Sequence, residues 1–137
     1  MTAIDATITQ APSRPMLWAG RVMSGLVILF LAMDTAMKLA DLPQVKQAAA
    51  GIGWPVGLDR TLGVIELVCL VLYAVPRTAV LGAILTTGLC GGAIAAHLRL
   101  GDPLFSHVLF GVYIGVMAWG GLWLRDPRLR ALMPVRR

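Results

Sequence analysis

The sequence predicts an all-α integral membrane protein, an antiparallel four-helix bundle with up-down topology. Hydrophobic residues make up 58% of its 137 residues and charged residues only 14%, against roughly 25% charged residues in a typical soluble chain. One soluble core of this size could not bury so much apolar surface, whereas a bilayer solvates it. Four apolar segments follow one another along the chain. In lipid they must be helices, because an open sheet would leave backbone groups without hydrogen bonds.

The predicted spans cover about residues 17–39, 58–75, 78–98 and 104–124. In the first span, Arg21 lies near the start and its long side chain can extend to the headgroups. The second span is interrupted by charged residues, Glu66 among them, and Pro76 ends it. The third span is the clearest, because no charged residue lies between Thr78 and Ala96.

The remaining segments are expected to lie outside the spans. Residues 1–15 form a flexible N-terminal arm, residues 16–126 the membrane domain and residues 127–137 a basic C-terminal tail. The longer connection between the first two spans is predicted to contain a short helix from Pro43 through Ala50. The chain lacks the basic start of a signal peptide, so the first span is expected to be retained.

The distribution of basic residues predicts the orientation of the chain. In this topology one side carries eight of the twelve, namely Arg14, Arg21, Arg77, Arg125, Arg128, Arg130, Arg136 and Arg137. The other side carries the remaining four, namely Lys38, Lys46, Arg60 and Arg99. Both termini are therefore predicted to be cytoplasmic. The C-terminal arginines suit anionic lipid headgroups, and the placement of charge at the ends argues against a nucleic-acid partner.

Small residues and cysteines within the spans have packing interpretations. Gly88-x-x-x-Gly92 and Gly111-x-x-x-Gly115 are patterns that permit two helices to approach closely. They are expected to pack helices within the chain, with a homodimer contact as the alternative. The two cysteines, Cys69 and Cys90, show no metal-ligand spacing and are expected to be buried apolar side chains, with a redox pair as the alternative.

Five polar side chains from four different spans are predicted to gather toward the outer membrane face: Asp34, Lys38, Glu66, His97 and His107. An ionisable group inside a membrane costs roughly 3 kcal/mol or more at the centre, so it usually has a partner or a function. Asp34 and Lys38 are four residues apart and share a helix face, and Lys38 is the predicted partner of Glu66 or Asp34. No pair has the His-x-x-x-His spacing of metal ligands, so no metal is expected.

Helical phase indicates that these groups point in a common direction. On the second span, Asp59, Gly63, Glu66 and Tyr73 form one stripe, and on the third span Thr86, Cys90, Ala93 and His97 form another. In a bundle both stripes can turn inward. The alternative is structural: an ion-pair network that only joins the first two helices, with His97 and His107 as solvated residues near the interface.

Several segments resemble the DoxX-like family of small four-helix bacterial membrane proteins. The matching segments are Met37-Lys38-Leu39, Gly63-Val64-Ile65-Glu66-Leu67, Pro76-Arg77-Thr78, Leu81-Gly82-Ala83, residues 91–99 and residues 119–125. The resemblance covers about residues 17–130, and Lys38, Glu66 and His97 occupy the family's characteristic polar positions. It implies a location in the bacterial inner membrane. The family takes its name from a membrane subunit of a thiosulfate:quinone oxidoreductase, which makes a quinone the candidate ligand.

Three functions are compatible with these observations. The first is a quinone- or lipid-binding component of a membrane redox system, with a membrane or soluble redox partner; His97 and Lys38 would bind the headgroup and Glu66 would exchange a proton. The second is a non-catalytic accessory or anchor subunit, in which the polar cluster is structural. The third is a small proton-coupled transporter built on the Glu66–Lys38 pair. The residues leave open whether the protein is an enzyme.

Overall fold

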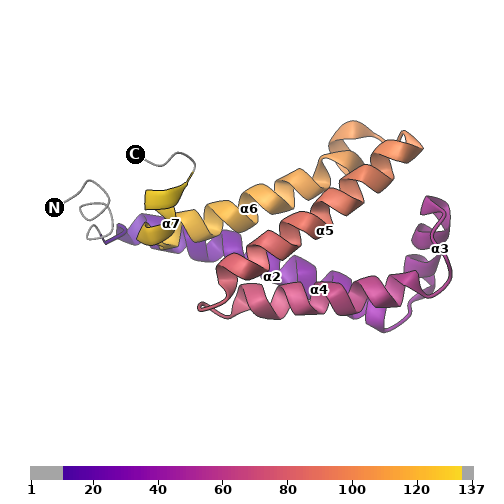
Figure 1. Ribbon diagram of the computed structural model, residues 1–137, viewed down its shortest axis with the longest axis horizontal. Coiled ribbons are helices and arrows are strands. Elements are labelled where there is room, and N and C mark those ends of the chain that lie inside the picture. Colours follow the sequence, from indigo (N-terminus) through magenta and orange to yellow (C-terminus); the bar gives the residue numbers. More distant parts are fainter. Residues whose placement is uncertain (1–10, 134–137) are drawn as a thin grey trace. The chain divides into compact units, whose positions relative to one another are not determined.

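A computed structural model describes residues 11–133, and every regular element in that range is a helix (Figure 1). The helices are α2 (Arg14–Leu39), α3 (Pro43–Ile52), α4 (Leu58–Ala74), α5 (Ala79–Leu100), η1 (Leu104–Val108), α6 (Phe110–Arg125) and α7 (Pro127–Leu132). The all-α prediction is therefore confirmed. The predicted spans correspond to α2, α4, α5 and the pair η1 and α6.

Three of these helical segments are long and apolar enough to cross a membrane: Arg14–Leu39, Ala79–Leu100 and Leu104–Arg125. The second predicted span is different, because α4 has only 17 residues and contains Asp59, Arg60 and Glu66. At a rise of 1.5 Å per residue it is about 26 Å long, slightly less than the roughly 30 Å of a bilayer's hydrocarbon core.

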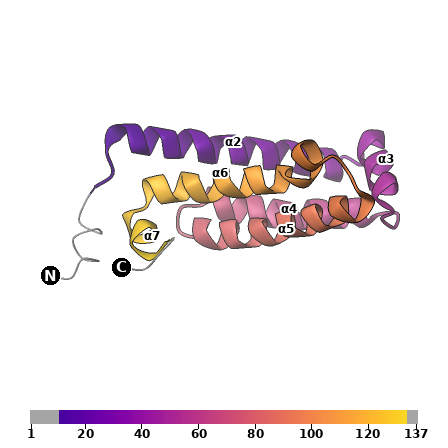
Figure 2. The same cartoon turned by 90° about the horizontal axis from the view of Figure 1, so that it is seen from above.

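The chain divides into two compact units, which we describe separately. In the unit of residues 28–115, α4 packs against α5, α5 packs against η1, and α3 contacts both α4 and α5. Figure 2 shows α4 and α5 side by side, with α3 near the end where α4 begins. The turn between α4 and α5 is closed by the Thr78 hydroxyl, which donates to the Leu72 carbonyl at 2.8 Å.

The other described unit joins residues 11–27 to residues 116–133. The first half of α2 lies directly against the end of α6, since a Cβ added at Gly20 would fall 2.8 Å from the Gly121 carbonyl oxygen. The buried Ser24 side chain also contacts Gly121. Arg130 on α7 reaches the sulfur of Met16 at 3.7 Å. These contacts need glycine where the two backbones approach.

Several boundaries differ from the predictions. The helix α2 begins at Arg14, inside the predicted arm of residues 1–15, whose first ten residues lie outside the described range. The predicted C-terminal tail contains α7, because the Asp126 carboxylate accepts a hydrogen bond from the backbone of Arg128 and Pro127 occupies a first-turn position. The short helix predicted through Ala50 extends to Ile52. The fourth predicted span starts as a π-helix, η1, before α6.

Large apolar side chains are exposed along the helices, while several polar ones are buried. Exposed residues on α2 include Trp18, Val22, Leu26, Leu29 and Met33, which recur at helical spacing. Water would disfavour such a stripe, but lipid tails solvate it. The buried polar or charged residues are Ser24, Thr35, Asp59, Glu66 and Thr86. This distribution is that of helices whose outer surface contacts lipid.

Candidate functional site

Lys38 lies between two carboxylates. Its Nζ atom is 2.6 Å from Asp34 Oδ2 and 2.7 Å from Glu66 Oε2. The sequence left open which carboxylate Lys38 would pair with, and the structure pairs it with both. We call Asp34, Lys38 and Glu66 the polar triad. Exposure decreases along it: the Asp34 side chain is 32% exposed, that of Lys38 19% and that of Glu66 2%.

Local structure brings the triad together. Asp34 and Lys38 are one turn apart on α2 and so lie on the same face. On α4, the predicted stripe of Asp59, Gly63, Glu66 and Tyr73 is buried along its length. Gly63 lies where α4 meets α2, because a Cβ added there would be 2.9 Å from Lys38 Cβ. The missing side chain permits the helix approach that places Glu66 beside the Lys38 ammonium.

The triad has an unequal number of charges of each sign. Two carboxylates face one ammonium, so the three groups carry an excess of one negative charge when all are ionised. A single ion pair would be enough to join two helices without net charge. An excess charge is unfavourable in a medium of low dielectric constant. Uptake of one proton by the triad removes that excess charge. The geometry is therefore suited to proton exchange.

The two histidines form a second group, near the end of α5. The Nδ1 atom of His97 lies 2.6 Å from Asp102 Oδ2, so an Nδ1–H donates to the carboxylate and Nε2 is left for another partner. The rings of His97 and His107 meet edge to face, with centroids 5.6 Å apart. His107 is exposed and is hydrogen-bonded to Ser106. Within residues 11–133, no hydrogen bond or ion pair joins either histidine to the triad.

Asp102 is a site residue that sequence reasoning missed. Gly101 ends α5 in the left-handed conformation, with φ of 72°, which a residue without a Cβ adopts readily. The backbone N–H of Asp102 then donates to the His97 carbonyl at 3.2 Å, a helix-ending arrangement that returns the chain toward His97. The signal was present in the sequence, as a Gly-Asp-Pro segment four residues after a histidine.

The predicted stripe on α5 is only partly buried. Thr86 is buried, Cys90 and His97 are half-buried, and Ala93 is exposed. Both cysteines are free thiols, with Cys69 buried on α4. Within residues 11–133, no three His, Cys, Asp or Glu side chains gather as a metal site would require.

Among residues 11–133, three of the four predicted packing glycines make no close contact with another helix. A Cβ added at Gly88, Gly92 or Gly115 would meet no atom within 4 Å, whereas one at Gly111 would lie 3.0 Å from the Cys90 carbonyl oxygen. Gly88 and Gly92 fall on the exposed face of α5, because its buried face consists of Ala79, Gly82, Ala83 and Thr86. The alternative interpretation, a contact between two copies, stays a prediction.

The structure is that of a helical membrane protein. It combines apolar helices of membrane-spanning length with an exposed apolar surface and a buried cluster of charged side chains. The sequence profile of the DoxX-like family matches residues 22–121, and the chain belongs to that family. The comparisons with curated proteins and with solved structures found no match. The family match contains Asp34, Lys38, Glu66, His97 and His107.

Proposed function

We propose that the polar triad binds a quinone-like small molecule as part of a membrane redox system. The observation that carries this proposal is the Lys38 ammonium, which contacts Asp34 and Glu66. An ammonium has three N–H donors, so Lys38 keeps one for a ligand. A carbonyl oxygen of a quinone headgroup is a hydrogen-bond acceptor of matching chemistry, and the flat apolar ring suits a site among membrane helices.

The excess carboxylate supports a proton-transfer role. Reduction of a quinone to a quinol adds two electrons and two protons to the carbonyl oxygens. The triad can supply one of these protons from Glu66, which is 2.7 Å from the Lys38 ammonium, and water supplies the other. A membrane or soluble redox partner supplies the electrons. In this proposal His97, whose Nδ1–H donates to Asp102, accepts at Nε2 a hydrogen bond from the hydroxyl that forms at the second oxygen.

Mass spectrometry of small molecules extracted with the detergent-purified protein tests the proposal. We expect a quinone to copurify with the wild type and to be lost from Glu66→Gln. Binding of an added short-chain quinone should weaken roughly tenfold or more in Lys38→Met, because a hydrogen bond to a charged group is lost. The matched control is Lys46→Met, which removes an exposed lysine paired with Asp41. Equal quinone binding by wild type, Glu66→Gln and Lys38→Met would refute the proposal.

A second candidate function is that of a non-catalytic anchor subunit. The observation that favours it is that both carboxylates of the triad are already paired with Lys38, as a purely structural network requires. In that case substitutions in the triad change the stability of the protein and leave quinone retention unaltered.

The proposed setting is the bacterial inner membrane, with α4 as the second of four spans in an antiparallel four-helix bundle and both termini in the cytoplasm. The family match and the three apolar segments support a membrane location. A membrane crossing by α4 is supported by its position, because α4 lies beside α5 within one compact unit. The polar triad would then lie toward the outer face.

A further inference from the structure

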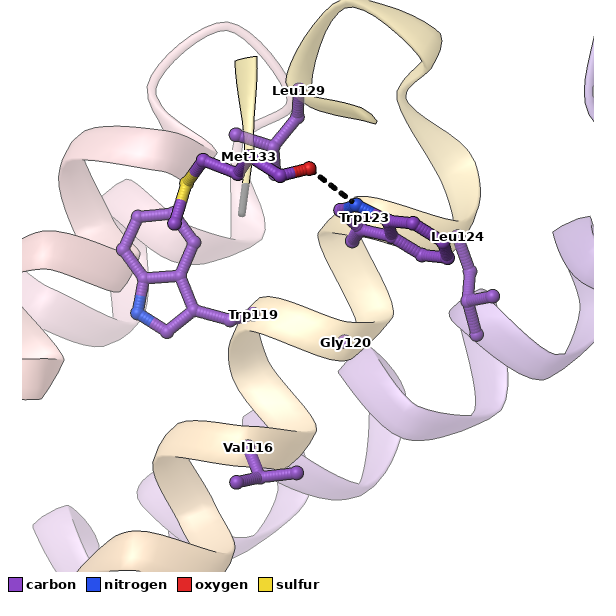
Figure 3. Close-up of a pocket in the computed structure, with 7 residues that line it drawn as sticks. All are labelled: Val116, Trp119, Gly120, Trp123, Leu124, Leu129 and Met133. Atoms are coloured by element: carbon purple, nitrogen blue, oxygen red, sulfur yellow. Dashed lines mark hydrogen bonds between the residues drawn. The ribbon is translucent and has the colours of Figure 1, made fainter. Parts of the chain in front are cut away.

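An acidic side chain without a partner is buried where α4 begins. Asp59 is 4% exposed, and its Oδ2 atom has no hydrogen-bond partner among residues 11–133. The apolar groove beside α6 and α7 has no such feature, because none of its lining residues is ionisable (Figure 3). Burying a carboxyl group without a hydrogen bond is unfavourable. Contact with water would therefore stabilise Asp59.

The helix α3 packs against this end of the unit of residues 28–115. It contacts α5 and also α4, in whose first turn Asp59 lies (Figure 2). Val45, Ala49 and Ile52 of α3 are covered and recur at helical spacing, whereas every other residue of the helix is exposed. The covered apolar side chains are therefore the ones that face α4 and α5.

Few contacts hold α3 in this position. Of its ten described residues, Ala49 alone is buried, and no side chain caps its first turn. Arg99 on α5 donates through a terminal nitrogen to the carbonyl of Ile52, the last residue of α3. Such a bond satisfies a carbonyl that a helix end leaves without a partner. A segment that buries so little apolar surface belongs to the least stable parts of a fold.

The backbone on both sides of α3 is suited to a hinge. Before the helix, Asp41 has a φ of 59°, which is uncommon for a residue with a Cβ. After it, Gly53 and Gly57 have φ of 78° and 86°, and glycine changes conformation at little cost. The exposed pair of Lys46 and Asp41 joins α3 to its own hinge and not to α4 or α5. Rotation at these positions can move α3 as a rigid helix.

We propose that α3 is a hinged lid, held closed by Arg99, whose opening exposes Asp59 to water. Hydration of Asp59 in the open state offsets the loss of the apolar contacts of α3. Asp59 is also the first residue of the buried stripe that continues to Gly63 and Glu66.

This inference rests on the proposed function only for the purpose of the motion. In that function, an open lid admits the water that supplies a proton for quinone reduction. The motion itself does not require a quinone. A failure of quinone binding would therefore leave the lid intact as an inference, and the experiments below are made without quinone.

The rate at which a thiol at position 59 reacts with a charged, water-soluble methanethiosulfonate tests the lid. Asp59→Cys is made in the full-length protein together with Cys69→Ala and Cys90→Ala, which remove both native thiols. Adding Arg99→Met should raise the labelling rate about tenfold, because a hydrogen bond from a charged donor is lost. The control is Arg77→Met, an exposed arginine in the turn at the other end of α4. Equal labelling rates in the Arg99→Met and Arg77→Met proteins would overturn the proposal.

A second pair of variants tests whether α3 itself covers position 59. In the same background, Ala49→Gln places a polar side chain on the covered face of α3 and should raise the labelling rate about tenfold. Ala48→Gln makes the same change at an exposed position and should leave the rate unaltered. If Ala49→Gln labels no faster than Ala48→Gln, the cover of Asp59 is not α3.

Hydrogen exchange in a protein that keeps its native cysteines gives an independent measurement. Asp59→Asn should slow amide exchange in Pro43–Ile52 about fivefold, because an amide is easier to bury than a carboxylate and the lid then closes more firmly. A substitution that merely loosened the packing would speed exchange instead. Exchange in Asp59→Asn that is as fast as in the wild type, or faster, would refute the role of Asp59 in opening the lid.

Discussion

At the residue scale, the central feature is one lysine shared by two acids. The Glu66 carboxylate is almost completely buried and is paired only through Lys38 among the described residues. The Lys38 ammonium, 2.7 Å away, offsets the free-energy cost of burying this charge. Removing one member of a buried pair destabilises a protein more than replacing both members does. The same geometry is compatible with a ligand site and with a structural network. The two functions must therefore be distinguished by measuring the ligand binding and the stability of variants in the triad.

A double-mutant cycle measures the coupling between Lys38 and Glu66. Lys38→Met should lower the free energy of unfolding by about 3 kcal/mol or more, because it leaves a buried carboxylate unpaired. Glu66→Gln should cost less, since the amide remains a hydrogen-bond acceptor. The double variant should recover part of the loss. Denaturation in detergent gives these values, and strictly additive losses would show that the two side chains do not interact.

Gly63 should be the least replaceable glycine near the triad. In Gly63→Ala the new Cβ would be 2.9 Å from Lys38 Cβ, and a forced separation of α4 from α2 should cost about 1–3 kcal/mol. Gly91→Ala is the control, because a Cβ there meets no atom within 4 Å. Alanine at that position should be neutral or stabilising by up to about 1 kcal/mol. Equal thermal stability of the two variants would contradict this packing.

At the scale of elements, short helices depend on side chains at their ends. With six residues, α7 is too short to be stable by backbone hydrogen bonding alone. It is held by the Asp126 cap, by the bond from Trp123 to Met133 and by the burial of Leu129. The helix α3 lacks a side-chain cap and begins with Pro43. Its first turn is linked to the preceding turn by the pair of Lys46 and Asp41.

Removal of the α7 cap should loosen that helix alone. Asp126→Ala should cost about 1 kcal/mol locally, equivalent to amide hydrogen exchange about fivefold faster in the segment Pro127–Leu132. Exchange in α6 should be unchanged, because its hydrogen bonds do not involve the cap. Hydrogen exchange read by mass spectrometry tests this, with Asp126→Asn as the control that keeps an acceptor. An unaltered exchange rate in the alanine variant would show that the cap is dispensable.

The connection between α2 and α3 should respond to acid. The hydrogen bond from Lys46 lowers the pKa of Asp41 below its usual value, so the folded state favours the ionised carboxylate. The resulting stabilisation is present at neutral pH and begins to fall below the unfolded pKa of about 3.9. It is lost as the pH drops through the lower folded value. NMR titration of Asp41 should show that Lys46→Met raises this pKa, and an unchanged pKa would contradict the pairing.

At the scale of the whole molecule, the number of membrane crossings depends on α4. If only the three long apolar segments cross, the two termini lie on opposite sides. If α4 also crosses, they lie on the same side. We expect the second result, because a helix of about 26 Å needs only slight thinning of the bilayer or extended side chains at its ends to cross it.

Reporter fusions at the two termini decide this topology. Green fluorescent protein fluoresces and alkaline phosphatase stays inactive when they are fused to a cytoplasmic end. We expect that pattern at both ends of this chain. Opposite patterns at the two ends would show that α4 does not cross, and would place Glu66 on a helix that lies at the membrane surface.

The sequence alone determined the helical membrane class, the presence of long apolar helices and the family. Segments that cross lipid must be long, apolar and internally hydrogen-bonded. Such segments can be recognised in the sequence from their hydrophobic composition. It also placed Asp34 and Lys38 on the same helix face, because that placement is local and follows from helical spacing. The short helix starting at Pro43 was likewise a local pattern of proline and glycine.

Only the tertiary structure decided which distant groups meet. The bond between Lys38 and Glu66 joins residues 28 positions apart, and it depends on how closely α2 approaches α4 at Gly63. The rotation of α5 places Gly88 and Gly92 on its exposed face, although their spacing is that of a packing motif. The pairing of His97 with Asp102 depends on the conformation in which α5 ends. The sequence spacing of the two residues did not specify that conformation. Such contacts depend on helix rotation and separation, which packing of the whole chain determines and local sequence pattern does not.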